Sequence, residues 1–328
     1  MYWGVRGVLI REKAETDPEY GKKPIERPVP DLLELGFVVL DKPSGHTSHE
    51  VAGWAKNMLG ATRAGHSGTL DPGVTGVLPI FLNRATKVVE ALKGAPKTYV
   101  GVMKLHGDYG LEGVRKVAAG FVGKIKQTPP VKSAVKREER EREVYSFQIL
   151  EADGRLVLFE TKVEAGTYIR KLCHDLGQKL GEGAHMAELR RTLAGPFTEE
   201  DAVTLQELSE AWNWFKESGD EKLLRKVVRP VEDAVAHLPK IVMKDSAVNN
   251  VCHGSRLGVN GVSKVDETVV ADGRVALLTL KGELVALGTA LLDGHQIKDT
   301  WEGDAATADG VVMARNAYPA SWRKQKHK

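Results

Sequence analysis

Cysteine is scarce in this sequence. Only Cys173 and Cys252 occur among the 328 residues, and neither belongs to a CxxC motif. We therefore expect neither a disulfide framework nor a structural zinc site, and we interpret both cysteines as small buried hydrophobic residues. No metal-ligand or nucleotide-binding motif occurs elsewhere, so the sequence predicts no metal ion and no cofactor.

Long hydrophobic runs are also lacking. None approaches the roughly 20 apolar residues that cross a bilayer, which excludes a membrane-spanning helix. The apolar stretch near the N-terminus is interrupted by Arg6 and followed by charged residues, without the cleavage pattern of a secretory signal. We therefore expect an intracellular protein.

The chain has little charge of either sign in excess. Its 47 Lys and Arg residues against 44 Asp and Glu give a formal net charge of +3, so a basic field over the whole molecule is excluded. Charge is instead segregated along the chain. Residues 84–106 and 120–142 carry +4 each, whereas residues 197–237 carry −5 and residues 240–314 carry −3. A polyanion must therefore bind a local surface.

The composition, with 42% hydrophobic and 28% charged residues, is that of a globular protein, and the length indicates two domains. Four prolines among charged residues at 11–35 predict an extended arm. Short β-rich runs beyond about residue 239 predict a compact second domain of β-barrel type. We divide the chain into an arm (1–35), a first domain (36–238), a second domain (239–315) and a basic tail (316–328).

Local patterns predict individual elements. A buried strand at 37–40 precedes a turn and a helix, whose capping box is Thr47 with Glu50 and whose end is Gly60. Asp153-Gly154 predicts a hairpin turn. We expect further strands at 98–105, 144–151, 156–163, 268–271, 274–280 and 283–292, a helix at 184–193, and helical structure within 197–237.

Residues 65–80 contain four glycines and two prolines. This composition argues against a regular helix or a central strand and predicts a tight loop. Asp71 lies in the middle, and Pro72 biases it away from the helical conformation. An Asp-Pro pair in such a loop is ordinarily a surface turn, so its meaning depends on the surrounding motif.

That motif resembles the signature of the TruB family of pseudouridine synthases. Five segments match in order and spacing, and two more resemble the guide-dependent branch, which comprises dyskerin and its archaeal counterparts. The five are DKPSGHTS (41–48), GHSGTLDP with TGVL (65–78), KTYVG (97–101), GTYIRKL (166–172) and MAELRR (186–191), and the two are TPPVKSAVKR (128–137) and MKDSAVNN (243–250).

The resemblance implies an α+β fold, with a mixed-sheet catalytic domain and a small β-barrel PUA domain at about 240–314. It also implies an isomerase that breaks the N1–C1′ bond of a uridine in RNA and rejoins C5 to C1′. No redox or group-transfer step occurs, so no cofactor is needed. Asp71 is the implied catalytic residue, either as a nucleophile at C1′ or as a base on the sugar.

The other site residues follow from the resemblance as well. Tyr99 is expected to stack on a flipped base, and Leu189 to form an apolar wall. Arg170 is the expected partner of Asp71, with Tyr168 two residues before it, so that on a strand both would face the same side. His66 has two readings of equal weight, one in nucleotide entry and one in the turn.

RNA contacts are expected from basic residues in two regions. Residues 120–142 resemble the mobile thumb loop of the family, although a solvated charged loop is an equally good interpretation. The second region is a local face of the acidic PUA segment. The candidates are Lys132, Lys136, Arg137 and Arg140 in the first region and Lys244, Arg256 and Lys264 in the second, and the run 323–328 is a further basic tail of low weight.

The leading hypothesis is the catalytic subunit of an archaeal H/ACA ribonucleoprotein that modifies rRNA and also tRNA in the cytoplasm. Archaeal origin is favoured because the chain stops at Lys328 without long Lys/Glu-rich tails. Implied partners are guide RNA, substrate RNA, a small zinc-binding protein, a glycine-arginine-rich protein and an L7Ae-type kink-turn-binding protein. Two alternatives stay open: a stand-alone tRNA pseudouridine synthase and a non-catalytic RNA-binding assembly factor.

Overall fold

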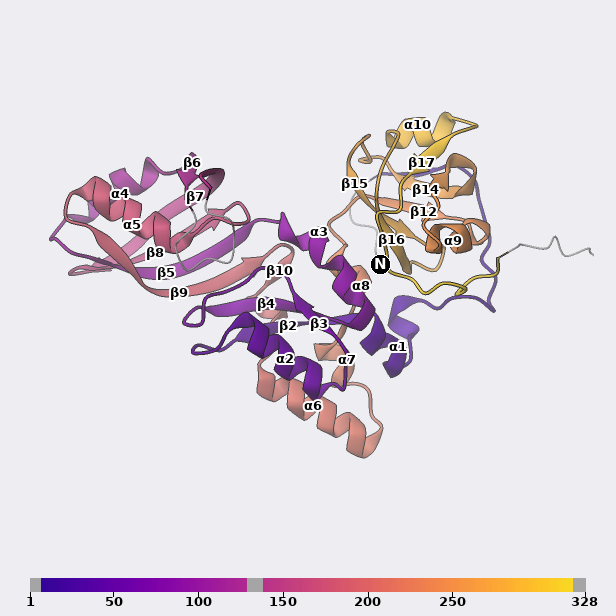
Figure 1. The fold of residues 1–328 in the computed structure, drawn as a ribbon, viewed down its shortest axis with the longest axis horizontal. Helices are drawn as coiled ribbons and strands as arrows, with labels where there is room; N and C mark the ends of the chain where they lie inside the picture. The colour runs from indigo at the N-terminus through magenta and orange to yellow at the C-terminus, as the bar shows by residue number, and fades with distance from the viewer. Residues whose placement is uncertain (1–6, 129–137, 321–328) are drawn as a thin grey trace, which may run out of the picture.

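The computed structural model describes residues 7–128 and 138–320, and two domains lie side by side in it (Figure 1). The larger domain carries a ten-stranded sheet of order β11-β2-β4-β9-β5-β8-β7-β6, with β3 added on β4 and β10 on β9. Its strands are β2 (Gly36–Lys42), β3 (Ala64–His66), β4 (Thr75–Leu82), β5 (Lys97–Leu105), β6 (Gly123–Gln127), β7 (Arg140–Asp153), β8 (Leu156–Val163), β9 (Ala184–Ala194), β10 (Phe197–Thr198) and β11 (Arg229–Pro230).

Helices bury the apolar faces of this sheet. On the half formed by β5, β7 and β8, helices α4 (Leu111–Ala119) and α5 (Ile169–Leu180) share one hydrophobic cluster with the strands. On the half formed by β2 and β4, one face packs against α2 and α6, and the other against η2, α8 and the second domain. The helices on and around this half of the sheet are α1 (Val29–Glu34), α2 (Ser48–Met58), η2 (Asn83–Val88), α3 (Val89–Lys93), α6 (Leu205–Ser218), α7 (Leu224–Val227) and α8 (Val231–Ala234).

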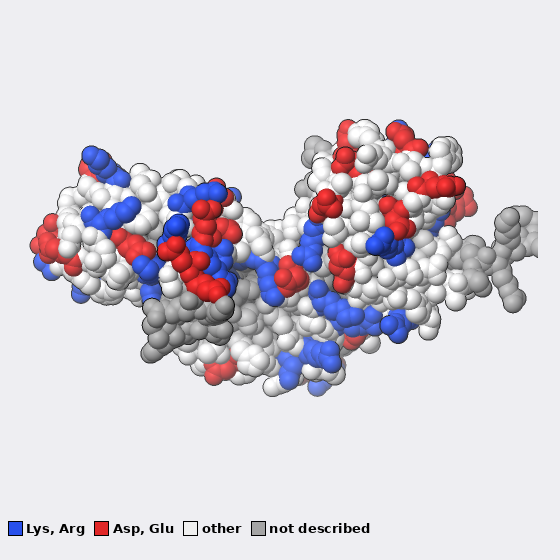
Figure 2. All heavy atoms as spheres, turned by 45° about the horizontal axis from the view of Figure 1, so that its top comes forward, with Lys and Arg blue, Asp and Glu red and all other residues white. Residues whose placement is uncertain are grey.

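The second domain is built on a mixed sheet of order β1-β14-β12-β15-β16-β18. A separate pair, β13 with β17, joins it through a bridge between Ala290 and Ala306. Acidic side chains are prominent on its surface in Figure 2. Its elements are β12 (Lys240–Met243), α9 (Asp245–Cys252), β13 (Leu257–Gly258), β14 (Val262–Asp266), β15 (Arg274–Leu278), β16 (Leu284–Thr289), α10 (Gly294–Asp299), β17 (Asp304–Ala306) and β18 (Gly310–Val311).

The N-terminal arm packs on this second domain. Its strand β1 (Val8–Ile10) is antiparallel to β14. Charged side chains of the domain also bind the arm's backbone: Lys281 Nζ donates to the Asp17 carbonyl at 2.8 Å, and the Asp245 carboxylate accepts from the Asp17 N–H at 2.9 Å. Further along, Arg27 makes a buried two-bond ion pair with Glu232, at 2.7 and 2.8 Å.

Several local predictions are confirmed. The capping box of Thr47 and Glu50 is formed at the start of α2, and Gly60 has a positive φ of 64° at its end. The hairpin at Asp153-Gly154 joins β7 and β8, and the region 197–237 contains α6, α7 and α8. The α+β class with a mixed sheet is also confirmed.

The predicted helix at 184–193 is wrong, because these residues form strand β9 between β4 and β5. Met186 and Leu189 are three apart, which suggested a helix. The register with β5 explains this spacing: Ala187 and Thr192 are extra residues on β9, and each such bulge turns an interval of two into one of three. Tertiary pairing therefore produces a pattern that imitates helical periodicity.

Three smaller predictions are also wrong. Residues 75–80 do belong to a central strand, β4, and Pro79 is tolerated because it lies between the part of β4 that pairs with β9 and the part that pairs with β3. Residues 268–271 form a turn, not a strand. Residues 11–35 are not wholly extended, since residues 29–34 form the helix α1, whose side chains Val29 and Leu32 are buried.

Candidate active site

The loop around Asp71 connects β3 to β4, and it is fastened to the turn between β2 and α2. The buried Ser48 hydroxyl accepts the Leu70 N–H at 2.8 Å, and the N–H of Gly45 donates to the Pro72 carbonyl at 2.9 Å. Two sequence motifs about 25 positions apart, 41–48 and 65–72, are therefore one structural unit. Its hydrogen bonds fix the backbone on both sides of the aspartate.

Lys42 lies beneath this unit. Its side chain is fully buried, and Nζ donates to the carbonyls of Pro43 and Pro72 at 2.7 and 3.1 Å. Burial lowers the pKa of Lys42, and the carboxylate of Asp71 opposes that shift. The lysine therefore supplies a positive charge under the loop while it holds the loop's carbonyls.

Asp71 itself is exposed between buried anchors. Leu70 and Val74 are each only 4% exposed and belong to the main hydrophobic cluster, whereas the Asp71 side chain is 53% exposed. A turn from the Asp71 carbonyl to the Val74 N–H, at 3.0 Å, closes the loop. The packing of its neighbours therefore presents the carboxylate to solvent in a defined position.

Arg170 forms an ion pair with Asp71, as expected from the family motif. The route differs from the expectation, since residues 168–170 are not a strand. Tyr168 is the N-cap of α5 and Arg170 lies in its first turn, because Ile169, Leu172 and Leu176 give a helical stripe that packs into the core. Tyr168 and Arg170 therefore project from a helix start.

Strand β6, which precedes residues 129–137, is hydrogen-bonded to the start of α5. The side chain of Gln127, at the end of β6, accepts from the Tyr168 N–H at 2.9 Å and donates to the Tyr168 carbonyl at 3.2 Å. Gln127 is 3% exposed, so this is a buried amide pair. These hydrogen bonds fix the end of β6 relative to the start of α5.

Tyr99 and Leu189 come from the adjacent strands β5 and β9. They are 9% and 8% exposed and share the hydrophobic cluster with Leu70 and Val74. Gly101 lies opposite Leu189, where an added Cβ would lie only 2.8 Å from Leu189 Cδ1. The structure thus brings Tyr99 and Leu189 into the cluster that anchors the Asp71 loop.

His66 ends β3, half-buried, and its Nδ1 is buried without a hydrogen-bond partner in the described structure. Burial lowers the pKa of His66, and the neighbouring Arg191 and His49 lower it further. No hydrogen bond joins it to Asp71 among the described residues, so its two readings stay predictions.

Sequence reasoning missed two buried cations behind the loop. Arg191 donates to the carbonyls of Val77 and Gly68 at 2.8 and 3.1 Å, and Lys97 donates to three carbonyls between residues 92 and 95. Burial and then Arg191 lower the pKa of Lys97 to about 8.

The RNA-contact candidates fall in different surroundings. Lys132, Lys136 and Arg137, and the basic run 323–328, lie outside the described residues, while Arg140 begins β7. Lys244 forms an ion pair with Glu12 of the arm, and Arg256 forms one with Asp304 at 3.2 Å. Lys264 lies on β14 opposite Ile10 of β1. The arm therefore covers part of the face predicted to contact RNA.

Within residues 7–128 and 138–320, no three His, Cys, Asp or Glu side chains are grouped so that they could hold a metal ion. The same residues include no helix that is long and apolar enough to cross a membrane.

Comparisons with known proteins find matches along nearly the whole chain. The N-terminal domain of TruB family pseudouridylate synthases matches residues 56–110 and 108–169, and the C-terminal domain of tRNA pseudouridylate synthase B matches 170–236. A protein of Archaeoglobus fulgidus described as probable tRNA pseudouridine synthase B is 51% identical over 314 residues, which cover 96% of this chain and 97% of that protein. The chain belongs to the TruB family of pseudouridine synthases. It is accordingly an RNA isomerase.

Two further domain models match regions outside the TruB domains. The DKCLD domain matches residues 4–52 and the PUA domain matches 239–312. A Methanosarcina barkeri protein with the same description as the Archaeoglobus one is 50% identical and covers 98% of this chain and 95% of its own. The second domain of the fold is thus a PUA domain, which confirms the predicted fold class.

Solved structures of the family superimpose closely. The crystal structure of a Cbf5-Nop10-Gar1 complex contains a chain that is 48% identical, with a TM-score of 0.89 and 97% of each chain covered. The structure of an H/ACA RNP bound to a substrate RNA containing 2′-deoxyuridine gives 46% identity and a TM-score of 0.89, covering 98% of this chain and 99% of that one.

Proposed function

We propose that this protein is the catalytic subunit of a guide-RNA-dependent H/ACA ribonucleoprotein and that Asp71 carries the reaction. The observation that supports this most directly is the ion pair between Asp71, on an exposed loop held by buried anchors, and Arg170, in the first turn of α5. A target uridine swings out of its helix, and its base stacks against Tyr99 beside the apolar side chain of Leu189. Tyr168 flanks the same space.

Asp71 attacks C1′ or removes a ribose proton, and both routes require an ionised carboxylate. Arg170 favours that state and orients it through its guanidinium. The N1–C1′ bond breaks with its electron pair left on N1, and the uracil turns within the pocket. Its C5 then forms the new bond to C1′ as Asp71 leaves C1′ or returns the ribose proton. The proton lost from C5 is balanced by a proton taken up at N1. The substrate's own atoms balance the reaction, so the chain's residues need only bind, orient and exchange protons.

The proposed partners are guide RNA and substrate RNA, proteins of the Nop10 and Gar1 type, and an L7Ae-type protein bound through the RNA. Supporting this, the solved chains that superimpose on this one are described in complexes with Nop10 and Gar1, one of them an archaeal box H/ACA sRNP. We place the complex in the cytoplasm of an archaeal cell, acting on rRNA uridines. We further propose the domain limits 1–35, 36–238, 239–315 and 316–328.

A second function is supported by one observation: curated relatives at 48–51% identity are described as probable tRNA pseudouridine synthase B. The same Asp71 would then act on tRNA without a guide. Pseudouridine mapping separates the two functions, using the chain alone or reconstituted with its partners, and with or without guide RNA. We expect rRNA conversion only with guide and partners. Complete guide-independent conversion of every substrate would overturn the ribonucleoprotein proposal.

A further inference from the structure

The guanidinium of Arg170 has little support of its own. Its ion pair with Asp71 is the only hydrogen bond or ion pair that this side chain makes within residues 7–128 and 138–320. Arg190, in contrast, is held by two carboxylates, those of Asp41 and Glu199. The direction of Arg170 therefore depends on the backbone from which it projects, which is the first turn of α5.

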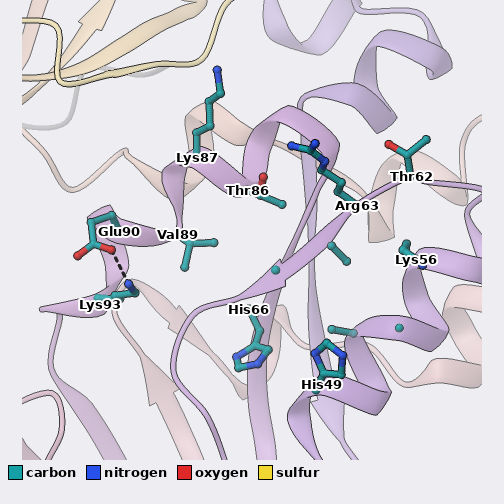
Figure 3. Close-up of a pocket in the computed structure, with 14 residues that line it drawn as sticks. His49, Lys56, Thr62, Arg63, His66, Thr86, Lys87, Val89, Glu90 and Lys93 are labelled. Atoms are coloured by element: carbon teal, nitrogen blue, oxygen red, sulfur yellow. Dashed lines mark ion pairs between the residues drawn. The ribbon is translucent and has the colours of Figure 1, made fainter. Parts of the chain in front are cut away.

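The cavity beside the catalytic loop does not supply the missing support. It has a volume of about 680 Å³, and its walls are α2, β3 and the segment η2–α3, with His49 and His66 at one end (Figure 3). None of the described residues that line it belongs to the segment 164–170. Arg170 is therefore oriented by the contacts of its own segment.

That segment begins a helix without a capping side chain. Tyr168 is the N-cap of α5, and its side chain makes no capping hydrogen bond. Helices more often begin at Ser, Thr, Asp or Asn, whose side-chain oxygen accepts a backbone N–H of the first turn. With tyrosine in this position, the helix start depends on contacts from other parts of the chain.

Two strands supply those contacts. From β7, the Glu143 N–H donates to the Glu164 carboxylate at 3.0 Å, and the Glu143 carbonyl accepts the Glu164 N–H at 2.8 Å. The chain then turns at Gly166, which has a positive φ of 82°. From β6, the Gln127 amide makes its two hydrogen bonds with Tyr168. The segment 164–168 is therefore held at both ends.

Gln127 holds the end next to Arg170. The Tyr168 carbonyl to which it donates also accepts the first hydrogen bond of α5, from the Leu172 N–H at 3.0 Å. Because Gln127 is only 3% exposed, water cannot readily replace its two bonds. The amide therefore fixes the peptide groups on both sides of Tyr168, two residues before Arg170.

We propose that Gln127 is a positioning residue for the isomerisation, and that it orients Arg170 toward Asp71 by fixing the backbone of Tyr168. The amide acts through Arg170 and needs no contact with the substrate. The inference rests on the proposed function, because it takes the roles of Asp71 and Arg170 from there. Loss of the amide should slow the chemical step and leave RNA binding unchanged.

The test replaces the amide with a side chain of similar size that cannot hydrogen-bond. Gln127→Leu removes both bonds to Tyr168, and Gln127→Asn, whose amide is one methylene shorter, is the second variant if the leucine variant does not fold. The matched control is Thr279→Val in the PUA domain. Thr279 is 1% exposed and likewise makes two hydrogen bonds with one residue, Glu283, at 3.1 and 3.2 Å.

The reconstituted complex is assayed by the release of tritium from substrate RNA labelled at uridine C5, and kcat and KM are determined separately. For Gln127→Leu we expect kcat to fall about 10- to 100-fold with KM unchanged within about twofold, because a misplaced catalytic group slows the reaction without weakening binding. Thr279→Val should lower the melting temperature and leave kcat unchanged.

A double-mutant cycle shows whether Gln127 acts through Arg170. In an Arg170→Ala background no guanidinium remains to be oriented, so Gln127→Leu should lower kcat by less than about threefold further. A residue with a merely structural role would lower kcat by the same factor in both backgrounds. That result, or an unchanged kcat in Gln127→Leu alone, overturns the inference.

Asp71→Asn and Arg170→Ala in the same assay separate this inference from the proposed function. If both variants retain the wild-type rate, the proposed function fails, and the role of Gln127 fails with it. If both variants are slow while Gln127→Leu keeps its rate, or loses it equally in the two backgrounds, only the role of Gln127 fails.

Discussion

The catalytic loop and the arm on the PUA domain use charge in opposite ways. At the loop, Asp71 and Arg170 pair while each remains about half exposed. At the arm, Arg27 and Glu232 pair with side chains that are 3% and 0% exposed, and Glu232 also accepts the Leu284 N–H at 2.8 Å. The first pair is accessible to a ligand, whereas the second is consumed in holding the domains together. Both are ion pairs, and the exposure of their side chains is what distinguishes the pair that can take part in chemistry from the pair that holds the fold together.

The largest effect should come from the exposed pair. Asp71→Asn removes the nucleophile or base while it preserves shape, so we expect pseudouridine formation to fall by at least about 10⁴-fold. Guide-RNA binding and the melting temperature should be unchanged because the carboxylate takes no part in the core. Mapping of pseudouridine in the reconstituted complex measures this. Substantial turnover by the variant would remove Asp71 from the mechanism.

The buried pair should affect stability instead. Glu232→Gln removes the carboxylate that neutralises Arg27 inside the protein, so the free energy of unfolding should fall by about 3–5 kcal/mol. Urea unfolding measures this, with Glu26→Gln as the matched control. That residue forms an exposed pair with Lys23, at 3.0 Å, and should change stability by less than about 1 kcal/mol. Equal effects of the two variants would contradict the contrast.

Arg170→Lys keeps the charge but loses the planar fork. We expect kcat/KM to fall about 100-fold, which corresponds to about 2.7 kcal/mol, because a lysine ammonium cannot reproduce the planar guanidinium that orients the carboxylate. The control is Arg115→Lys, at an exposed pair with Glu112 on α4. Near-normal turnover by Arg170→Lys would show that charge alone supports Asp71.

The smallest effect concerns pH. The pKa of Lys97 is about 8 in the folded protein, below its ordinary 10.5, because burial and Arg191 disfavour the charged form. Between these two values the unfolded chain binds more protons, so this residue makes stability rise with increasing pH. Lys97→Met should remove that rise when the unfolding free energies of variant and wild type are compared from pH 7 to 10. Parallel pH curves would contradict it.

Local sequence signals predicted the parts of the fold that local chemistry decides. The capping box at Thr47 and the turn at Asp153-Gly154 are such cases, since each depends on residues a few positions apart. Strand β9 is different. Its neighbours β4 and β5 and its two bulges come from distant parts of the chain, and only that pairing explains why Met186 and Leu189 are spaced as in a helix.

In the candidate site, too, some residues could be predicted from the sequence, and others depend on contacts with distant parts of the chain. Family motifs predict the Asp71–Arg170 pair, but they do not show that Arg170 lies at the start of a helix. Ser48, Gln127 and Arg191 were missed because their roles depend on carbonyls and amides far away in sequence. A polar residue in an apolar segment signals that such a partner exists, but it does not say where.

The pairing of β1 with β14 has a consequence for how the chain is made. Val8 lies opposite Asp266, so strand β1 pairs with a strand synthesised more than 250 residues later. At about 5–20 residues per second, the arm waits roughly 13–50 s for its partner. During that time the larger domain can complete its own sheet. The arm is thus translated well before its partner strand and is among the last segments to reach its final position.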